Sequence, residues 1–90
     1  MTVEYNRPTH LEVDLETLTE NYHILKRHVS PRIVMVVLKA NAYGHGLVKV
    51  AKALTEAGCS HIAVAYLEEG LLLRKSGITA TILILGGDHW

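Results

Sequence analysis

The residue of this sequence with the clearest chemical potential is Lys39, which follows directly after the apolar run at residues 33–38. A lysine at the end of a buried strand loses part of its hydration, and this loss lowers the pKa of its amine. The neutral amine can then form a Schiff base with a carbonyl compound. Residue frequencies alone favour an ordinary surface lysine. Its position favours chemistry, because functional groups of parallel α/β folds gather at the carboxyl ends of strands.

The residues after Lys39 suggest an anion site. Gly44 and Gly46 would let the backbone approach an anion at a helix N-terminus, although they also suit an ordinary loop. They match neither the Walker pattern nor the dinucleotide-binding pattern. The Tyr43 hydroxyl could bind a phosphate oxygen, or its ring could simply pack. His45 has no histidine or carboxylate at a ligand spacing, so we expect a loop histidine and no metal site.

Two other features have a structural interpretation. Cys59, beside Gly58, is expected to be a small buried residue. Glu68 and Glu69 are expected to be helix N-terminal charges, since adjacent helical positions do not face one another as a catalytic carboxylate pair would.

Strands and helices alternate along the sequence. Continuous apolar runs predict strands buried on both faces, and apolar residues at spacings of three and four predict amphipathic helices. The predicted strands are residues 33–38, 61–65 and 80–85, and the predicted helices are residues 15–28, 47–57 and 67–75. Gly58 and Gly77 are expected to end the last two helices. This order indicates an α/β fold with a parallel sheet and right-handed crossovers.

The N-terminal part is predicted to differ. Residues 1–9 are expected to form an irregular arm, and the alternation at 10–14 predicts a short half-buried strand with Asp14 as the N-cap of the first helix. Nothing in the sequence covers the edges of the strands at 33–38 and 80–85. We therefore expect the 90 residues to be the opening segment of a larger barrel or sheet.

Composition excludes several classes of protein. Nine basic and nine acidic residues balance, which argues against nucleic acid or an anionic membrane as partner. The single cysteine excludes a disulfide framework and fits a reducing cytoplasm. The N-terminus does not resemble a secretory signal, and no apolar run approaches the length of a membrane helix.

The segment at 37–46 resembles, over its whole length, the pyridoxal-phosphate attachment motif of alanine racemases. The segments at 7–14, 63–70 and 82–86 are also similar to that family. The resemblance implies that residues 1–90 are the N-terminal part of a parallel (β/α)8 TIM-type barrel that binds pyridoxal 5'-phosphate, incomplete in this chain, and that a C-terminal β domain is absent. The strand near 11–13 would belong with that domain, and the full-length enzyme would be a homodimer.

The resemblance also implies roles for single residues. Lys39 would form the internal aldimine and act as a base on one face of the substrate Cα, Tyr43 would contact the cofactor phosphate, and Leu85 would line the cofactor pocket. The second base would be a tyrosine of the partner subunit, and an arginine from later strands would pair with the pyridine nitrogen. Both lie outside this sequence, so the 90-residue chain alone is expected to be inactive.

The resulting hypothesis is a cytoplasmic alanine racemase that interconverts L-alanine and D-alanine and supplies D-alanine for peptidoglycan. Three alternatives remain: a related barrel racemase for another amino acid such as serine, a non-catalytic protein of pyridoxal-phosphate homeostasis, and a folding fragment with no function alone.

Overall fold

A computed structural model describes residues 2–6, 11–39 and 45–86 of the chain, with side chains for 15–38 and 46–86. Seven elements follow one another: β1 (Thr2–Asn6), α1 (Leu11–Val29), β2 (Met35–Lys39), α2 (His45–Glu56), β3 (His61–Val64), α3 (Leu67–Lys75) and β4 (Thr81–Ile84).

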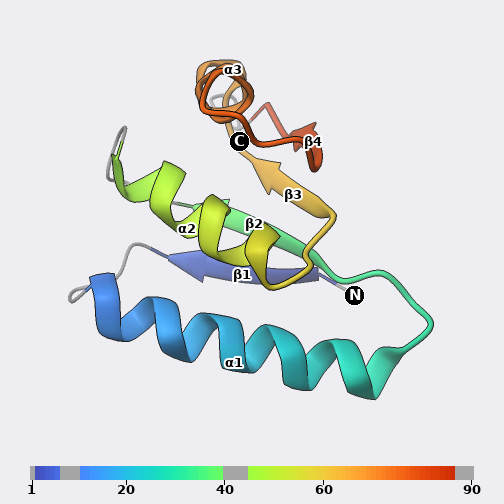
Figure 1. Cartoon of the computed structure of the whole chain (residues 1–90). Coiled ribbons are helices and arrows are strands. Elements are labelled where there is room, and N and C mark those ends of the chain that lie inside the picture. The colour runs from blue at the N-terminus through green and yellow to red at the C-terminus, as the bar shows by residue number, and fades with distance from the viewer. Residues whose placement is uncertain (1, 7–10, 40–44, 87–90) are drawn as a thin grey trace.

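The four strands form one parallel sheet in the order β1-β2-β3-β4. Each strand is thus hydrogen-bonded to the next along the chain, and a helix makes each connection (Figure 1). This arrangement is what successive right-handed βα units produce. It confirms the predicted α/β fold class and the parallel sheet.

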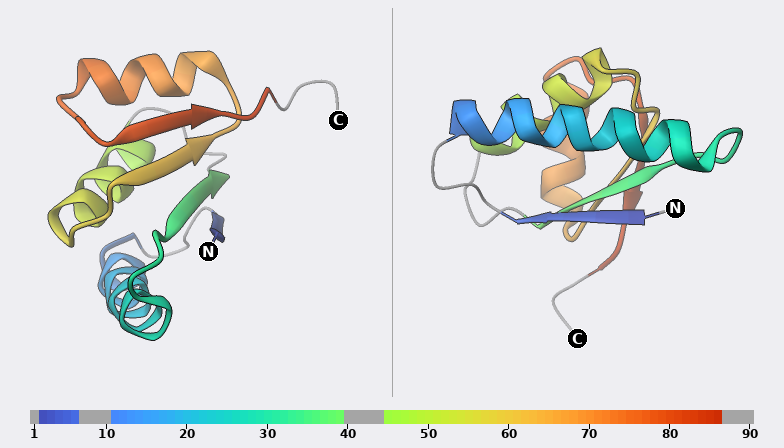
Figure 2. Two further views of the ribbon diagram at one scale, coloured as in Figure 1. Left: turned by 90° about the vertical axis from the view of Figure 1, so that its right-hand side faces the viewer. Right: turned by 90° about the horizontal axis from the view of Figure 1, so that it is seen from below.

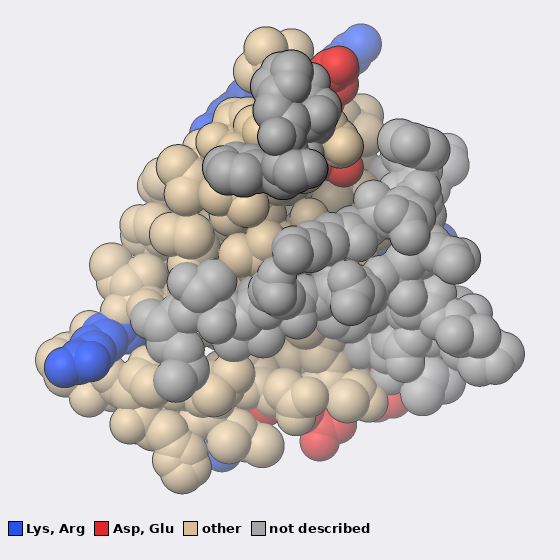
Figure 3. Space-filling model, turned by 180° about the vertical axis from the view of Figure 1, so that it is seen from behind, with Lys and Arg blue, Asp and Glu red and all other residues tan. Residues whose placement is uncertain are grey.

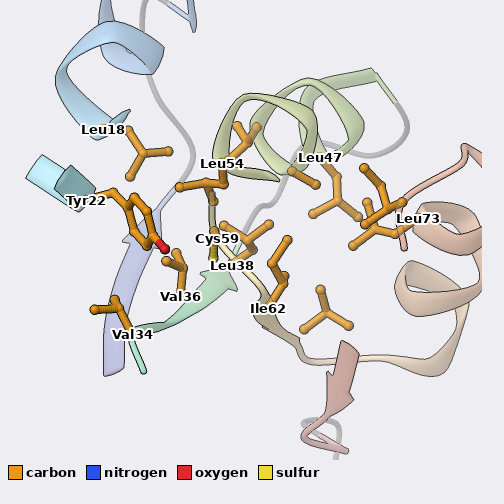
Figure 4. Packing of buried hydrophobic residues seen from close by; sticks show 14 residues of the cluster. Leu18, Tyr22, Val34, Val36, Leu38, Leu47, Leu54, Cys59, Ile62 and Leu73 are labelled. Atoms are coloured by element: carbon orange, nitrogen blue, oxygen red, sulfur yellow. The ribbon is translucent and has the colours of Figure 1, made fainter. Parts of the chain in front are cut away.

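The hydrophobic core lies between the sheet and the three helices, as Figure 4 shows. Alternate residues of β2 and β3 enter it, namely Val36, Leu38, Ile62 and Val64. The helices add Leu18, Tyr22, Leu47, Val50, Ala51, Leu54 and Leu73. The intervening strand residues Val37 and Ala63 are also buried, although they are not part of this cluster. Both central strands are therefore buried on both faces, as their unbroken apolar runs predict.

Glycine ends both α2 and α3. Gly58 and Gly77 have φ values of 105° and 94°, a left-handed conformation that costs glycine little. The amide of Cys59 donates to the carbonyl of Leu54 at 2.9 Å, and that of Ile78 donates to Leu73 at 3.1 Å. These are the bonds of a Schellman ending, and they confirm the predicted helix ends.

The N-terminal predictions are wrong. Residues 2–6 form β1 rather than an irregular arm, and α1 begins at Leu11, so no strand forms at 10–14 and Asp14 lies inside the helix. Leu11 also stands four and seven residues before Leu15 and Leu18, so a helical stripe accounts for it as well as a strand does. The sequence also assigned a strand near residues 11–13 to a C-terminal β domain, and this assignment is wrong because these residues are helical.

The sheet edges also differ from expectation. β1 pairs in parallel along β2, from Thr2 opposite Met35 to Asn6 opposite Lys39, so the edge of β2 is covered. In the described part of the chain β4 pairs with β3 alone. Leu83 and Ile84 of β4 are 46% and 36% exposed. The prediction of an uncovered edge therefore holds at β4 and fails at β2.

Candidate functional site

The carboxyl ends of β2, β3 and β4 lie at one edge of the sheet, where their arrowheads point to the same side (Figure 2, left). Lys39 is the last residue of β2, one residue after Leu38, whose partner in the register is Val64 at the end of β3. The amide of Leu85 donates to the carbonyl of Val64 at 2.8 Å. The structure thus brings the backbones of Lys39 and Leu85 to either side of the end of β3.

Leu85 adds an exposed apolar side chain to this edge. Leu85 is 38% exposed and follows Leu83 and Ile84, which are also partly exposed. Gly86 next to them has a φ of 66°, which turns the chain away from the strand direction directly after Leu85. Apolar side chains of this kind are typical of the walls of small-molecule sites.

Tyr43 and Gly44, the other predicted contacts of an anion, lie outside the described residues. α2 begins at His45, and Gly46 belongs to its first turn. The predicted phosphate contact of Tyr43 therefore stays a prediction.

The turn from β3 to α3 lies at the same edge and consists of Ala65 and Tyr66. The carboxylate oxygen Oε1 of Glu69 accepts hydrogen bonds from both of their amides, at 3.1 Å from Ala65 and 3.0 Å from Tyr66. Glu69 is thus a helix N-terminal charge, as the sequence predicts, and it also binds the end of the preceding strand. The available signal was its position three residues after Tyr66, the spacing of a capping box.

Cys59 and Tyr22 lie apart from this edge, in the core between α1 and the sheet (Figure 4). The Cys59 thiol donates to the carbonyl of His61 at 3.3 Å, and burial raises the pKa of the thiol. Burial, with a smaller contribution from Cys59, raises the pKa of Tyr22 as well. A buried thiol with a raised pKa is a poor nucleophile, which confirms the structural interpretation of Cys59.

A shallow hollow of about 540 Å³ is lined by His23, Lys26, Arg27 and Ser30 at the end of α1. The chain enters β2 at Met35 shortly after this helix ends, so the hollow lies near the amino ends of the strands. Basic side chains are expected there, because cations stabilise the C-terminal end of a helix. The hollow is therefore not part of the site near Lys39.

The described residues contain neither a candidate metal site nor a candidate membrane helix. Within residues 2–6, 11–39 and 45–86, no three His, Cys, Asp or Glu side chains are grouped so that they could hold a metal ion. None of the helices in those ranges is long and apolar enough to cross a membrane. Seen from behind, the described surface carries most of its charged residues toward the margin (Figure 3).

Comparison with known proteins gives a consistent result. Residues 13–90 match the family model described as alanine racemase, N-terminal domain. Alanine racemase 2 of Caldanaerobacter subterraneus is 56% identical over 81 residues, which are 89% of this chain and 21% of that protein. Alanine racemase of Geobacillus kaustophilus is 49% identical over 87 residues, 96% of this chain and 23% of that protein. The chain thus spans between a fifth and a quarter of the length of these relatives. No solved structure matches it.

Proposed function

We propose, from the premise that this chain belongs to the alanine racemase N-terminal domain family, that the protein interconverts L-alanine and D-alanine with pyridoxal 5'-phosphate held by Lys39. The α/β sheet is accordingly the start of a TIM barrel. The observation that carries the proposal is the place of Lys39, at the carboxyl end of a strand that is buried on both faces. In barrels of this kind the reacting groups stand at that end of the strands.

The residues present fit this cofactor. Pyridoxal phosphate carries an aldehyde, which an amine can bind, and a flat ring, which apolar side chains can cover. Lys39 supplies the amine, and Leu85 supplies part of the apolar wall across the end of β3. Tyr43, four residues after Lys39, supplies a hydroxyl for the phosphate.

The reaction exchanges the proton on the substrate Cα between two faces. The cofactor, when bound, delocalises the negative charge that develops at Cα. Lys39 has two tasks, since its amine holds the cofactor and, when released from it, carries a proton to or from one face of Cα. The opposite face needs a second base, which we assign to a tyrosine of a C-terminal domain in the partner subunit of a homodimer.

We further propose that the product D-alanine serves peptidoglycan synthesis in the cytoplasm. Three relatives, including alanine racemase 2 of Bacillus subtilis at 47% identity, carry the name alanine racemase, which supports the production of D-alanine. Cys59, the single cysteine of the sequence, is buried as a free thiol, which is compatible with a reducing compartment.

The test is a coupled assay for D-alanine on the natural full-length protein. Lys39→Ala should lower turnover by at least about 10²–10⁴-fold, the contribution of a positioned acid–base group. Lys52→Ala is the matched control, because Lys52 is an exposed lysine on α2 and its loss should leave turnover unchanged. Turnover of serine but not alanine would assign the protein to another racemase. Cofactor binding without turnover of either amino acid would assign it to cofactor storage.

A further inference from the structure

Glu69 makes one contact that neither its helix nor the proposed reaction requires. Its Oε1 atom accepts from the amides of both Ala65 and Tyr66, at 3.1 Å and 3.0 Å. Its neighbour Glu68 has the same charge and lies on the same first turn of α3, but it is exposed and takes no part in these bonds. The carboxylate of half-buried Glu69 therefore makes specific hydrogen bonds that the negative charge of this turn alone does not explain.

Helix capping accounts for only one of the two bonds. In a capping box, the acidic residue at the third helical position reaches back to the amide of the N-cap residue, which here is Tyr66. The second bond goes one residue further back, to Ala65, which directly follows the last residue of β3. The carboxylate thus joins α3 to the end of the preceding strand.

The end of β3 lies between the backbones of the two predicted cofactor residues, Lys39 and Leu85. Val64, just before Ala65, is paired on one side with Leu38, the residue before Lys39. On its other side Val64 pairs with Ile84, and its carbonyl accepts the amide of Leu85 at 2.8 Å. Only Ala65 and Tyr66 separate β3 from α3, so a shift of this short turn must move Val64 or be absorbed within two residues.

We infer that Glu69 is a positioning residue of the cofactor site, whose carboxylate fixes the end of β3 and with it the spacing of Lys39 and Leu85. This inference rests on the proposed function. Hydrogen bonds from two amides to one charged acceptor are strong enough for this task, because each such bond contributes more than a neutral one. Glu69 acts through the backbone and not on the substrate.

The experiment uses the natural full-length protein and four variants: Glu69→Ala, Glu69→Asp, Glu69→Gln and Glu68→Ala. Amide hydrogen exchange of Ala65 and Tyr66 is measured without cofactor, and the affinity for pyridoxal phosphate is measured from the absorbance of the lysine-bound form. Glu69→Ala should speed exchange of both amides and weaken cofactor binding, each by at least about tenfold, which is the loss of one bond to a charged group.

The other variants separate positioning from folding and charge. Glu69→Gln retains an acceptor oxygen at the same reach but loses the charge, so both readouts should lie between those of the unmodified protein and those of Glu69→Ala. Glu69→Asp keeps the charge at the helix N-terminus, but its shorter side chain should not reach the amide of Ala65. This variant should therefore weaken cofactor binding, and it replaces Glu69→Ala in the comparison if Glu69→Ala does not fold. Glu68→Ala should behave like the unmodified protein.

Two results would overturn the inference. If Glu69→Ala or Glu69→Asp speeds exchange but leaves cofactor affinity unchanged, Glu69 is a helix cap and nothing more. If exchange is unchanged, the two bonds do not hold the turn. Failure of the unmodified protein to bind the cofactor at Lys39 would instead refute the proposed function, and the site inference with it.

Discussion

Leu54 of α2 offers a direct test of how the helices are packed on the sheet that carries Lys39. Its side chain has no exposed surface and lies in the core among Leu38, Leu47 and Cys59 (Figure 4). Leu54→Ala removes three carbon atoms, worth about 2.4 kcal/mol at about 0.8 kcal/mol for each buried methylene. The cavity that remains adds to this, and measured costs for such changes are about 2.7–5 kcal/mol. We expect the free energy of unfolding to fall by about 3 kcal/mol.

The assay is urea unfolding followed by far-ultraviolet circular dichroism. The matched control is Leu71→Ala, which makes the same chemical change on α3 at a side chain that is 59% exposed, and it should cost no more than about 0.5 kcal/mol. Equal costs for the two variants would mean that α2 does not pack on β2 and β3 as described.

Three further predictions concern the site, pH and the isolated chain. Tyr43→Phe should weaken cofactor retention by about 1–2 kcal/mol, the loss of one hydrogen bond to a charged group, and unchanged affinity in equilibrium dialysis would return Tyr43 to a packing role. Burial raises the pKa of Cys59 and Tyr22 above their ordinary values of 9.0 and 10.0, so above about pH 9 the folded chain keeps protons that the unfolded chain releases. The free energy of unfolding should therefore fall as the pH rises through this range, and urea titrations of Cys59→Ala should show a smaller fall. The 90-residue chain alone should not racemise alanine and should self-associate through the exposed apolar residues of β4, which a D-alanine assay and sedimentation velocity would check.

The sequence predicted the part of the fold whose signals are local. The bounds of α3 agree with the prediction, and β2, β3 and β4 begin and end within two residues of it. Glycines at 58 and 77 mark helix ends through their own backbone conformation, so they could be recognised without any partner. Strands buried on both faces likewise show in an unbroken apolar run.

The N-terminal part depended on a distant partner and could not be predicted in this way. Residues 2–6 form a strand because they pair with Met35–Lys39, and nothing local specifies that pairing. Five alternating residues at 10–14 are too few to distinguish a strand from the first turn of a helix. The same limit applies to the site. The place of Lys39 follows from a local pattern, whereas the hydrogen bond that the amide of Ala65 donates to Glu69 depends on the geometry of a turn.

The central claim is that Lys39 is the residue that holds the cofactor. The most direct measurement is borohydride reduction of the natural protein with pyridoxal phosphate, followed by peptide mapping by mass spectrometry. The four other lysines, Lys26, Lys49, Lys52 and Lys75, are internal controls, because they are all exposed on helices. We predict a pyridoxyl group on Lys39 alone. A label on any of the other four in place of Lys39 would contradict the account.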